Sequence, residues 1–127
     1  MSLSIQPRSR IVALTLLSLF LAAPSFAESR PSRLWRASVA AIIAGTTLDA
    51  VSSWNGLEAN PMLRSANGRF GLKGVGIKAG LTGGLLTLQY WGIRRRPSHE
   101  SLAVKTNFVM TGIYAGVAAH NFSIRAR

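Results

Sequence analysis

The chain has no cysteine and little negative charge. Zero cysteines among 127 residues exclude disulfide bonds, thiolate metal sites and a cysteine nucleophile. Only 4 residues are Asp or Glu, and charged residues of both signs make up 15% of the sequence, against about 25% in a typical soluble domain. Apolar residues reach 48%. This composition favours a membrane protein with a single domain.

The usual motifs of metal, phosphate and nucleophile chemistry are also missing. The two histidines, His99 and His120, lack the spacing of a zinc site. The glycine-rich residues 71–84 lack the Gly-Lys-Ser ending of a phosphate-binding loop, and no serine lies in a nucleophile-elbow pattern. The sequence therefore predicts no metal, no cofactor and no catalytic residue, and favours a protein that is not an enzyme.

Positive charge is abundant, with a net charge of +11. A nucleic-acid-binding domain needs a contiguous basic surface on a soluble fold, whereas these basic residues gather where apolar segments end. They are Arg30, Arg33 and Arg36; Arg64, Arg69 and Lys73; Arg94, Arg95 and Arg96; and Arg125 and Arg127. This pattern is typical of charges that face anionic headgroups, so it predicts membrane lipids, and not nucleic acid, as partners.

Residues 1–27 resemble a secretory signal peptide. Arg8 and Arg10 precede an apolar run over residues 11–23, and Ser25 and Ala27 supply small side chains at the two positions that a signal peptidase inspects. We expect cleavage after residue 27. The alternative is an uncleaved first membrane anchor, in which flanking residues extend a run that is short for one crossing.

Three longer apolar stretches follow, at residues 35–54, 72–93 and 102–122, each about the length of one membrane crossing. None alternates as a strand does, and helices satisfy every backbone group in lipid. The predicted fold is therefore all-α, a bundle of three transmembrane helices over residues 35–122. A polar linker at 28–34 precedes it and a basic tail at 123–127 follows it, in a multi-pass protein of the cell inner membrane.

Small residues recur four positions apart on all three predicted helices. This spacing lets helix backbones approach closely in lipid, so it predicts mutual packing of the helices. The residues are Ala37, Ala41 and Gly45; Gly76, Gly80 and Gly84; and Gly112 and Gly116.

Two opposite charges are predicted at similar depth. Asp49 lies about 7 Å before the end of the first helix, and Lys78 lies about 9 Å into the second, which returns from the same membrane face. An ionisable residue in lipid is costly and normally faces a partner or a cavity. The pair has two open interpretations: it neutralises two charges and fixes the helix register, or it forms part of a binding site.

A one-sided polar cluster is expected around this pair, because the third helix returns to the same face. Its candidate binding residues are Asp49, Ser52, Ser53, Lys78, Tyr114, His120 and Asn121, with Glu58 and Asn60 in a loop that would cover them.

The segment Asp49-x-x-Ser52-Ser53-x-x-Gly56-x-Glu58-x-Asn60-Pro61, with Lys78 in the next apolar stretch, resembles a family of small bacterial integral-membrane proteins of unknown function. That family looks like an acidic residue near the end of a membrane helix, then Ser or Thr, then a Gly-x-Glu-x-Asn-Pro turn. The likeness is close over residues 49–61 and looser over 36–122. It implies a membrane fold and location, and it implies no activity.

Three functional classes are compatible with these features. The leading prediction is a non-enzymatic membrane component that binds a lipid headgroup, a small ion or a partner helix through the Asp/Lys cluster. The second is a structural or assembly subunit whose glycine faces contact another membrane protein or a second copy. The third is an intramembrane enzyme acting on lipid, which needs a pocket that reaches water and a second titrating group.

Overall fold

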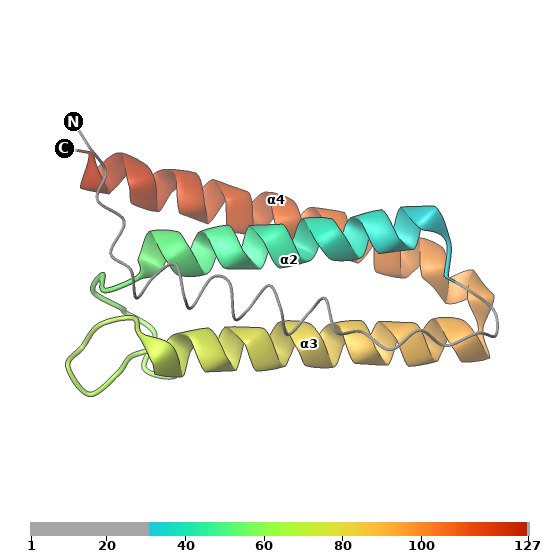
Figure 1. Ribbon diagram of the computed structural model, residues 1–127, viewed down its shortest axis with the longest axis horizontal. Coiled ribbons are helices and arrows are strands. Elements are labelled where there is room, and N and C mark those ends of the chain that lie inside the picture. The colour runs from blue at the N-terminus through green and yellow to red at the C-terminus, as the bar shows by residue number, and fades with distance from the viewer. Residues whose placement is uncertain (1–30, 127) are drawn as a thin grey trace.

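The computed structural model describes residues 31–126, and within this range the chain forms three α-helices and no named β-strand. They are α2 (Arg33–Ser53), α3 (Leu72–Arg95) and α4 (Glu100–Arg125), with a short 3-10 helix η1 (Pro97–His99) before α4. Figure 1 shows α3 running antiparallel to α2, and α4 running back along α2. The all-α prediction is therefore confirmed. The predicted signal peptide, residues 1–27, lies outside the described residues.

The first helix begins earlier than the predicted linker allows. The Ser32 hydroxyl accepts the N–H of Trp35 at 3.1 Å, which is an N-cap contact, so the helix starts at Arg33 within the predicted linker 28–34. At its other end, Asn55 takes a left-handed conformation with φ 61°, and the chain turns into the loop 54–71.

The other two helices are also longer than the predicted crossings. α3 continues from Ile93 to Arg95, and α4 begins at Glu100 and ends at Arg125. Residues 123–125 of the predicted basic tail are therefore helical. Pro97 opens η1, where its fixed φ and missing N–H are tolerated because a helix start has no acceptor for that N–H.

Two of the three helices, α2 and α4 with its preceding η1 turn, are long and apolar enough to cross a membrane. α3 has the length but falls short in hydropathy, because its apolar residues alternate with glycines and threonines and it carries Lys78 and Gln89. Of the three predicted crossings, two are thus supported by helix length and hydropathy.

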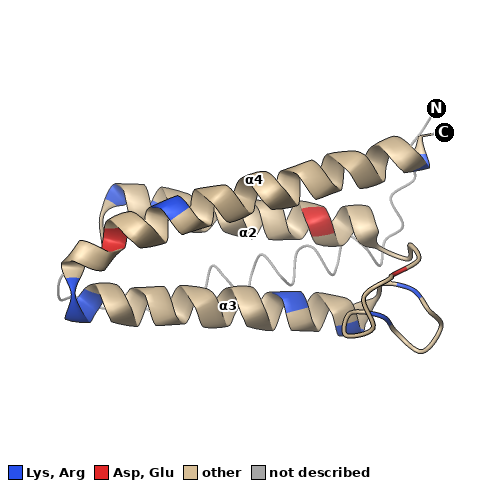
Figure 2. Cartoon of the chain, turned by 180° about the vertical axis from the view of Figure 1, so that it is seen from behind, with Lys and Arg blue, Asp and Glu red and all other residues tan. Residues whose placement is uncertain are grey.

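Polar side chains share the interior of the bundle with apolar ones such as Ile42 and Leu86, and many large apolar side chains lie outside. Buried polar or charged residues are Ser38, Thr46, Asp49, Ser52, Thr82 and Asn107. Exposed large apolar residues on the helices include Leu48, Leu81, Leu88, Trp91, Phe108, Val109, Ile113 and Val117. Figure 2 shows that most charged residues lie at the two ends of the helices. A surface that is apolar in the middle and charged at both ends matches the layering of a bilayer.

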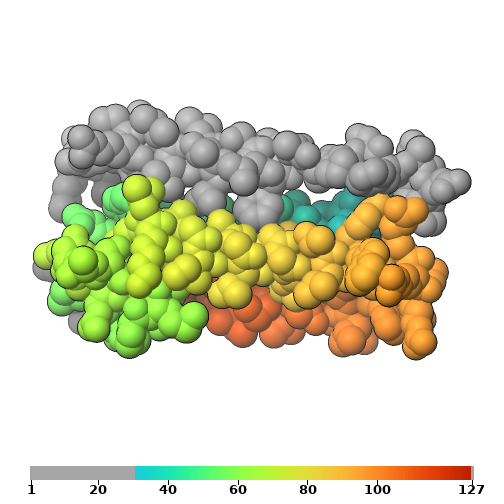
Figure 3. Space-filling model, turned by 90° about the horizontal axis from the view of Figure 1, so that it is seen from below, coloured from blue at the N-terminus to red at the C-terminus, as the bar shows by residue number. Residues whose placement is uncertain are grey.

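Two small apolar clusters close the ends of this polar interior. Trp35, Ile93, Ala103 and Val104 pack together where α2 starts and α3 ends. At the other end, Ala50, Phe70 and Val75 form the second cluster, beside the loop 54–71. Figure 3 shows the face of the molecule on which this loop, α3 and the α3–α4 connection follow one another.

Candidate functional site

The centre of the candidate site is an ion pair between α2 and α3. The Lys78 ammonium donates to the Asp49 carboxylate, and the exposed fractions of the two side chains are 16% and 4%. Both residues lie within helices and not at their ends, and burial takes both charges out of water. Each charge therefore offsets the desolvation cost of the other. The two residues predicted at matched depth are therefore brought together.

The second carboxylate oxygen of Asp49 has a weaker partner. The Ser53 hydroxyl, one turn further along α2, lies 3.5 Å from Asp49 Oδ1. Asn121 on α4 then donates its side-chain amide to Ser52 Oγ at 3.2 Å and to Ser53 Oγ at 3.1 Å. These contacts join all three helices at one level of the bundle.

An aromatic ring closes the loop side of the ion pair. Phe70, just before α3, is 2% exposed, and the Lys78 ammonium lies 5.0 Å from its ring centroid, within the range of a cation–π contact. The ring fills the space over Gly74, where an added Cβ would meet Phe70 Cε2 at 2.4 Å and the Leu63 carbonyl at 2.8 Å. Only glycine leaves room for Phe70 to reach Lys78.

The loop itself is held by backbone pairing. Asn55 donates to the Phe70 carbonyl at 2.9 Å, and Phe70 donates to the Gly56 carbonyl at 2.9 Å. Further along, Glu58 donates to the Gly68 carbonyl at 3.1 Å. These bonds fix the position of Phe70 against the ion pair.

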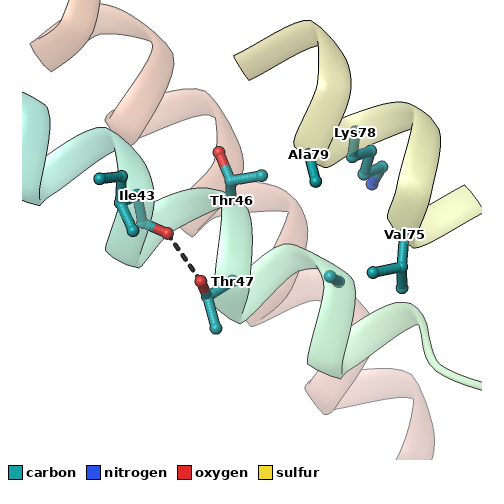
Figure 4. A pocket seen from close by; sticks show the side chains of 7 residues that line it. Ile43, Thr46, Thr47, Val75, Lys78 and Ala79 are labelled. Carbon is teal, nitrogen blue, oxygen red and sulfur yellow. Dashed lines mark hydrogen bonds between the residues drawn. The ribbon is translucent and has the colours of Figure 1, made fainter. Parts of the chain in front are cut away.

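A small hollow lies beside Lys78 between α2 and α3. It is lined by Ile43, Thr46, Thr47, Ala50, Val75, Lys78 and Ala79. Its volume of about 10 Å³ is close to that needed by one water molecule. Figure 4 shows Ala79 of α3 opposite Thr46 of α2, with Lys78 on the α3 side, while Thr47 turns its hydroxyl back to the Ile43 carbonyl at 2.8 Å. The hollow accordingly offers an apolar wall with the Lys78 chain at one side.

Glu58 and Asn60 build the loop and do not reach the ion pair. The Glu58 carboxylate accepts the N–H of Asn60 at 2.8 Å, and the Asn60 side chain accepts the N–H of Met62 at 3.0 Å. Both are local turn contacts, with the asparagine in the typical turn-forming role of its short side chain. The prediction that this pair covers the polar cluster is not met by these contacts.

Tyr114 and His120 also lie apart from the ion pair. Tyr114 is half-buried on α4, where its Cβ faces Gly45. His120 is exposed, and its carbonyl accepts the Ser123 hydroxyl. Of the predicted cluster, the structure thus assembles Asp49, Ser52, Ser53, Lys78 and Asn121.

A second polar group, which sequence reasoning missed, lies towards the other end. Gln89 on α3 donates to Asn107 Oδ1 at 2.8 Å, and Asn107 on α4 donates to the Ser38 hydroxyl of α2 at 3.0 Å. Asn107 and Ser38 are both fully buried. The sequence signal for this group was Asn107 in the predicted third crossing, because a polar side chain in an apolar helix needs a partner.

Between the two groups, Thr46 of α2 lies 3.5 Å from Thr82 of α3, oxygen to oxygen. Thr46 also donates to the Ile42 carbonyl at 2.8 Å, so its hydroxyl is satisfied within α2. We call the set Ser38, Thr46, Asp49, Ser52, Ser53, Lys78, Thr82, Gln89, Asn107 and Asn121 the polar ladder. Its polar contacts connect the three helices at successive levels along the bundle.

Among the predicted packing glycines, only Gly45 lies at a helix contact within residues 31–126. An added Cβ there would meet Thr111 Cα at 3.3 Å, so α2 and α4 approach closely at this point. Within residues 31–126, and apart from the backbone of their own helix and their chain neighbours, no atom lies within 4 Å of such a Cβ at Gly76, Gly80, Gly84, Gly112 or Gly116. Ala37 is exposed and Ala41 half-buried. Mutual packing through the glycines of α3 and α4 is therefore not seen, because these glycines point away from the neighbouring described helices.

The arrangement holds charge without an evident metal or catalytic group. Residues 31–126 contain no group of three His, Cys, Asp or Glu side chains that could hold a metal ion. The acid and base of the site neutralise one another, and the hollow beside them is small. Chemically, the site can fix three helices and present one lysine at their edge.

Comparisons with protein-family models, with curated proteins and with solved structures gave no match.

Proposed function

We propose that this chain is a multi-pass protein of the bacterial inner membrane, with three crossing helices, and that it serves as a non-enzymatic membrane component. The observation that carries the proposal is the exposed apolar surface of the helices: Leu81, Leu88 and Val109 lie outside, while Asn107, Ser38 and Asp49 are buried beside the apolar core. In water, so extended an apolar surface would drive aggregation. In a bilayer, the acyl chains solvate such an apolar outer surface, and polar side chains turn towards the interior of the bundle.

α3 crosses with its neighbours in this proposal, although its own hydropathy is lower. Its Lys78 is neutralised by Asp49, and its Gln89 is bonded to Asn107. Both polar side chains therefore avoid lipid, and the outer side of α3 keeps Leu81, Leu88 and Trp91.

Of the predicted ligands, a small cation is supported least, because the Asp49 carboxylate already binds the Lys78 ammonium and lies near the Ser53 hydroxyl. A lipid or a partner helix is supported better, because Leu81, one turn after Lys78 on α3, is exposed and can lie against an acyl chain or an apolar side chain. We propose that a phospholipid lies along this side of α3, with its phosphate near the partly exposed Lys78.

An assembly role is the second candidate, and one observation favours it. Gly76, Gly80 and Gly84 leave open space along one side of α3, and Gly112 and Gly116 do so on α4. Small residues on a lipid-facing side permit another membrane helix to approach. A complex of fixed mass on native gels would favour this role over lipid binding.

The test of the membrane proposal is a topology map of the full chain. Reporter fusions after residues 60, 98 and 127 place the loop 54–71, η1 and the chain end on one side or the other. Three crossings predict the same side for residues 60 and 127, and the opposite side for 98. All three reporters in one compartment would refute the proposal.

A further inference from the structure

Five exposed arginines surround the end of the bundle that lies opposite the ion pair. Arg33 and Arg36 lie at the start of α2, and Arg94, Arg95 and Arg96 lie at the end of α3. The two groups are neighbours, because Trp35 and Ile93 from these same turns pack in one apolar cluster. We call these five residues the arginine collar.

The collar has no acceptor within the described part of the chain. Over residues 31–126, the single ion pair is that of Lys78 and Asp49, and none of the five guanidinium groups donates a hydrogen bond there. Glu100, at the start of α4, is the nearest acid in sequence and forms no ion pair within this range. Twenty-five N–H donors, at five per guanidinium group, thus lack a described protein acceptor.

Basic residues at the opposite end behave differently. Arg69 donates to the Asn55 carbonyl at 2.7 Å, Lys73 donates to the Arg64 carbonyl at 3.2 Å, and Arg125 donates to the Trp54 carbonyl. There these three side chains bind the loop, and those of Lys73 and Arg125 connect it to α3 and α4. These three basic side chains thus donate to the chain itself, whereas the five collar guanidinium groups donate to no acceptor within residues 31–126.

Aromatic rings hold part of the collar at a fixed level. The Arg95 guanidinium lies 3.7 Å from the Trp91 ring centroid, and that of Arg94 lies 5.9 Å from the ring centroid of Tyr90. Trp91, about one turn before these arginines, and Leu88, about two turns before them, are exposed and apolar. Guanidinium groups over tryptophan and tyrosine, next to an exposed apolar side, suit the boundary between acyl chains and headgroups.

We infer that the arginine collar binds the phosphate group of an acidic phospholipid, whose acyl chains lie along Leu88 and Trp91. Guanidinium binds phosphate through two parallel N–H···O bonds and stays charged at any physiological pH. The five positive charges favour an anionic lipid, because the cationic group of a zwitterionic headgroup would be repelled by these side chains. This inference rests on the proposed membrane placement, and it concerns a different end of the bundle from Lys78.

Native mass spectrometry of the full chain in detergent tests the inference. The protein is mixed with equal amounts of phosphatidylglycerol and phosphatidylcholine, and the bound lipids are counted. With about 1 kcal/mol for each basic residue near a headgroup, we expect the wild type to prefer phosphatidylglycerol by at least about tenfold. The variant Arg94→Gln/Arg95→Gln/Arg96→Gln is expected to lower this preference by at least about tenfold, and Arg33 and Arg36 account for what remains.

A matched control removes the same charge from the other end. Arg64→Gln/Arg69→Gln/Lys73→Gln is expected to keep the preference, with helix content of both variants checked by circular dichroism. Equal lipid preference in the wild type and the collar variant, or equal loss in both variants, would overturn the inference. Displacement of the lipid by millimolar inorganic phosphate would overturn it too, because it would mark a site for free anions. Recovery of the protein in the soluble fraction would instead refute the membrane placement itself.

Discussion

Lys78 reaches from α3 to Asp49 on α2, and the two side chains form the ion pair that joins these helices. The same ammonium lies over the Phe70 ring, so the first turns of α3 and the end of the loop 54–71 meet at one point. Because α4 reaches the same level through Asn121, this relationship positions every helix of the bundle.

Breaking the pair on one side should cost more than removing both charges. Asp49→Asn leaves an unpaired ammonium, and Lys78→Met leaves an unpaired carboxylate; each is expected to lower the free energy of unfolding by up to about 3 kcal/mol, somewhat less than for a fully buried pair because Lys78 is partly exposed. The double variant should recover most of this loss. Thermal unfolding in detergent measures all four proteins as a double-mutant cycle.

The same cycle separates the two interpretations of the pair. Recovery of both stability and phospholipid binding in the double variant indicates a purely structural pair. Recovery of stability with binding still lost indicates that Lys78 contacts the lipid, as proposed. Additive losses in the double variant would contradict the pairing of the two charges.

Asn107 is expected to be the most sensitive position of the polar ladder outside the ion pair. Asn107→Ala removes its bonds to Ser38 and Gln89 and leaves the Gln89 side-chain amide without a described partner, although Ser38 keeps its bond to the Trp35 carbonyl; we expect a cost of about 1–2 kcal/mol in unfolding free energy. Thr87→Ala is the control, because the Thr87 hydroxyl bonds only the Gly83 carbonyl of its own helix and is exposed. Chemical unfolding in mixed micelles compares the two, and equal losses would argue against the interhelical role of Asn107.

Gly74 and Gly76 provide a matched pair on one helix. Gly74→Ala drives a methyl group into Phe70 and the Leu63 carbonyl, so we expect a loss of about 1–3 kcal/mol in stability and a displaced loop. Gly76→Ala meets no described atom and should gain about 0.5 kcal/mol from the higher helix propensity of alanine. Melting temperatures of the two variants test this directly.

The Gly76 variant also bears on the assembly role. If another membrane helix packs on this side of α3, Gly76→Ala should weaken a complex seen on native gels while the isolated chain stays as stable as before. An unchanged complex together with a stable monomer would speak against that use of the glycines.

Much of the fold was predictable because its signals are local. Apolar stretches of crossing length, bounded by Pro97 and by the turn after Ser53, predicted three helices within a few residues. The ion pair was predictable too, since two antiparallel helices of known length place Asp49 and Lys78 at one depth. The helix start at Arg33 depends on the single hydroxyl of Ser32. It was not predicted, because the polar composition of residues 28–34 indicated a linker.

The rest of the polar ladder depends on contacts that sequence spacing does not encode. Gln89 and Asn107 lie 18 residues apart, and Asn107 and Ser38 lie 69 apart. Which side of α4 faces α2 is decided by close packing at Gly45, and that choice turns Asn107 inward and His120 outward. Small residues recur four positions apart on α3 and α4 as they do before Gly45 on α2. This spacing alone does not show whether the small-residue side of a helix faces another helix of the bundle.

The most direct test uses the absence of cysteine, which permits single nitroxide labels at chosen positions. Power-saturation electron paramagnetic resonance is measured on the full chain in lipid vesicles, with labels at Leu88, Val109 and Met62. The account predicts that Leu88 and Val109 collide with oxygen and not with a water-soluble nickel complex, whereas Met62 in the loop collides with the nickel complex. Ready collision of the nickel complex with Leu88 and Val109 would place these helices in water and contradict the account.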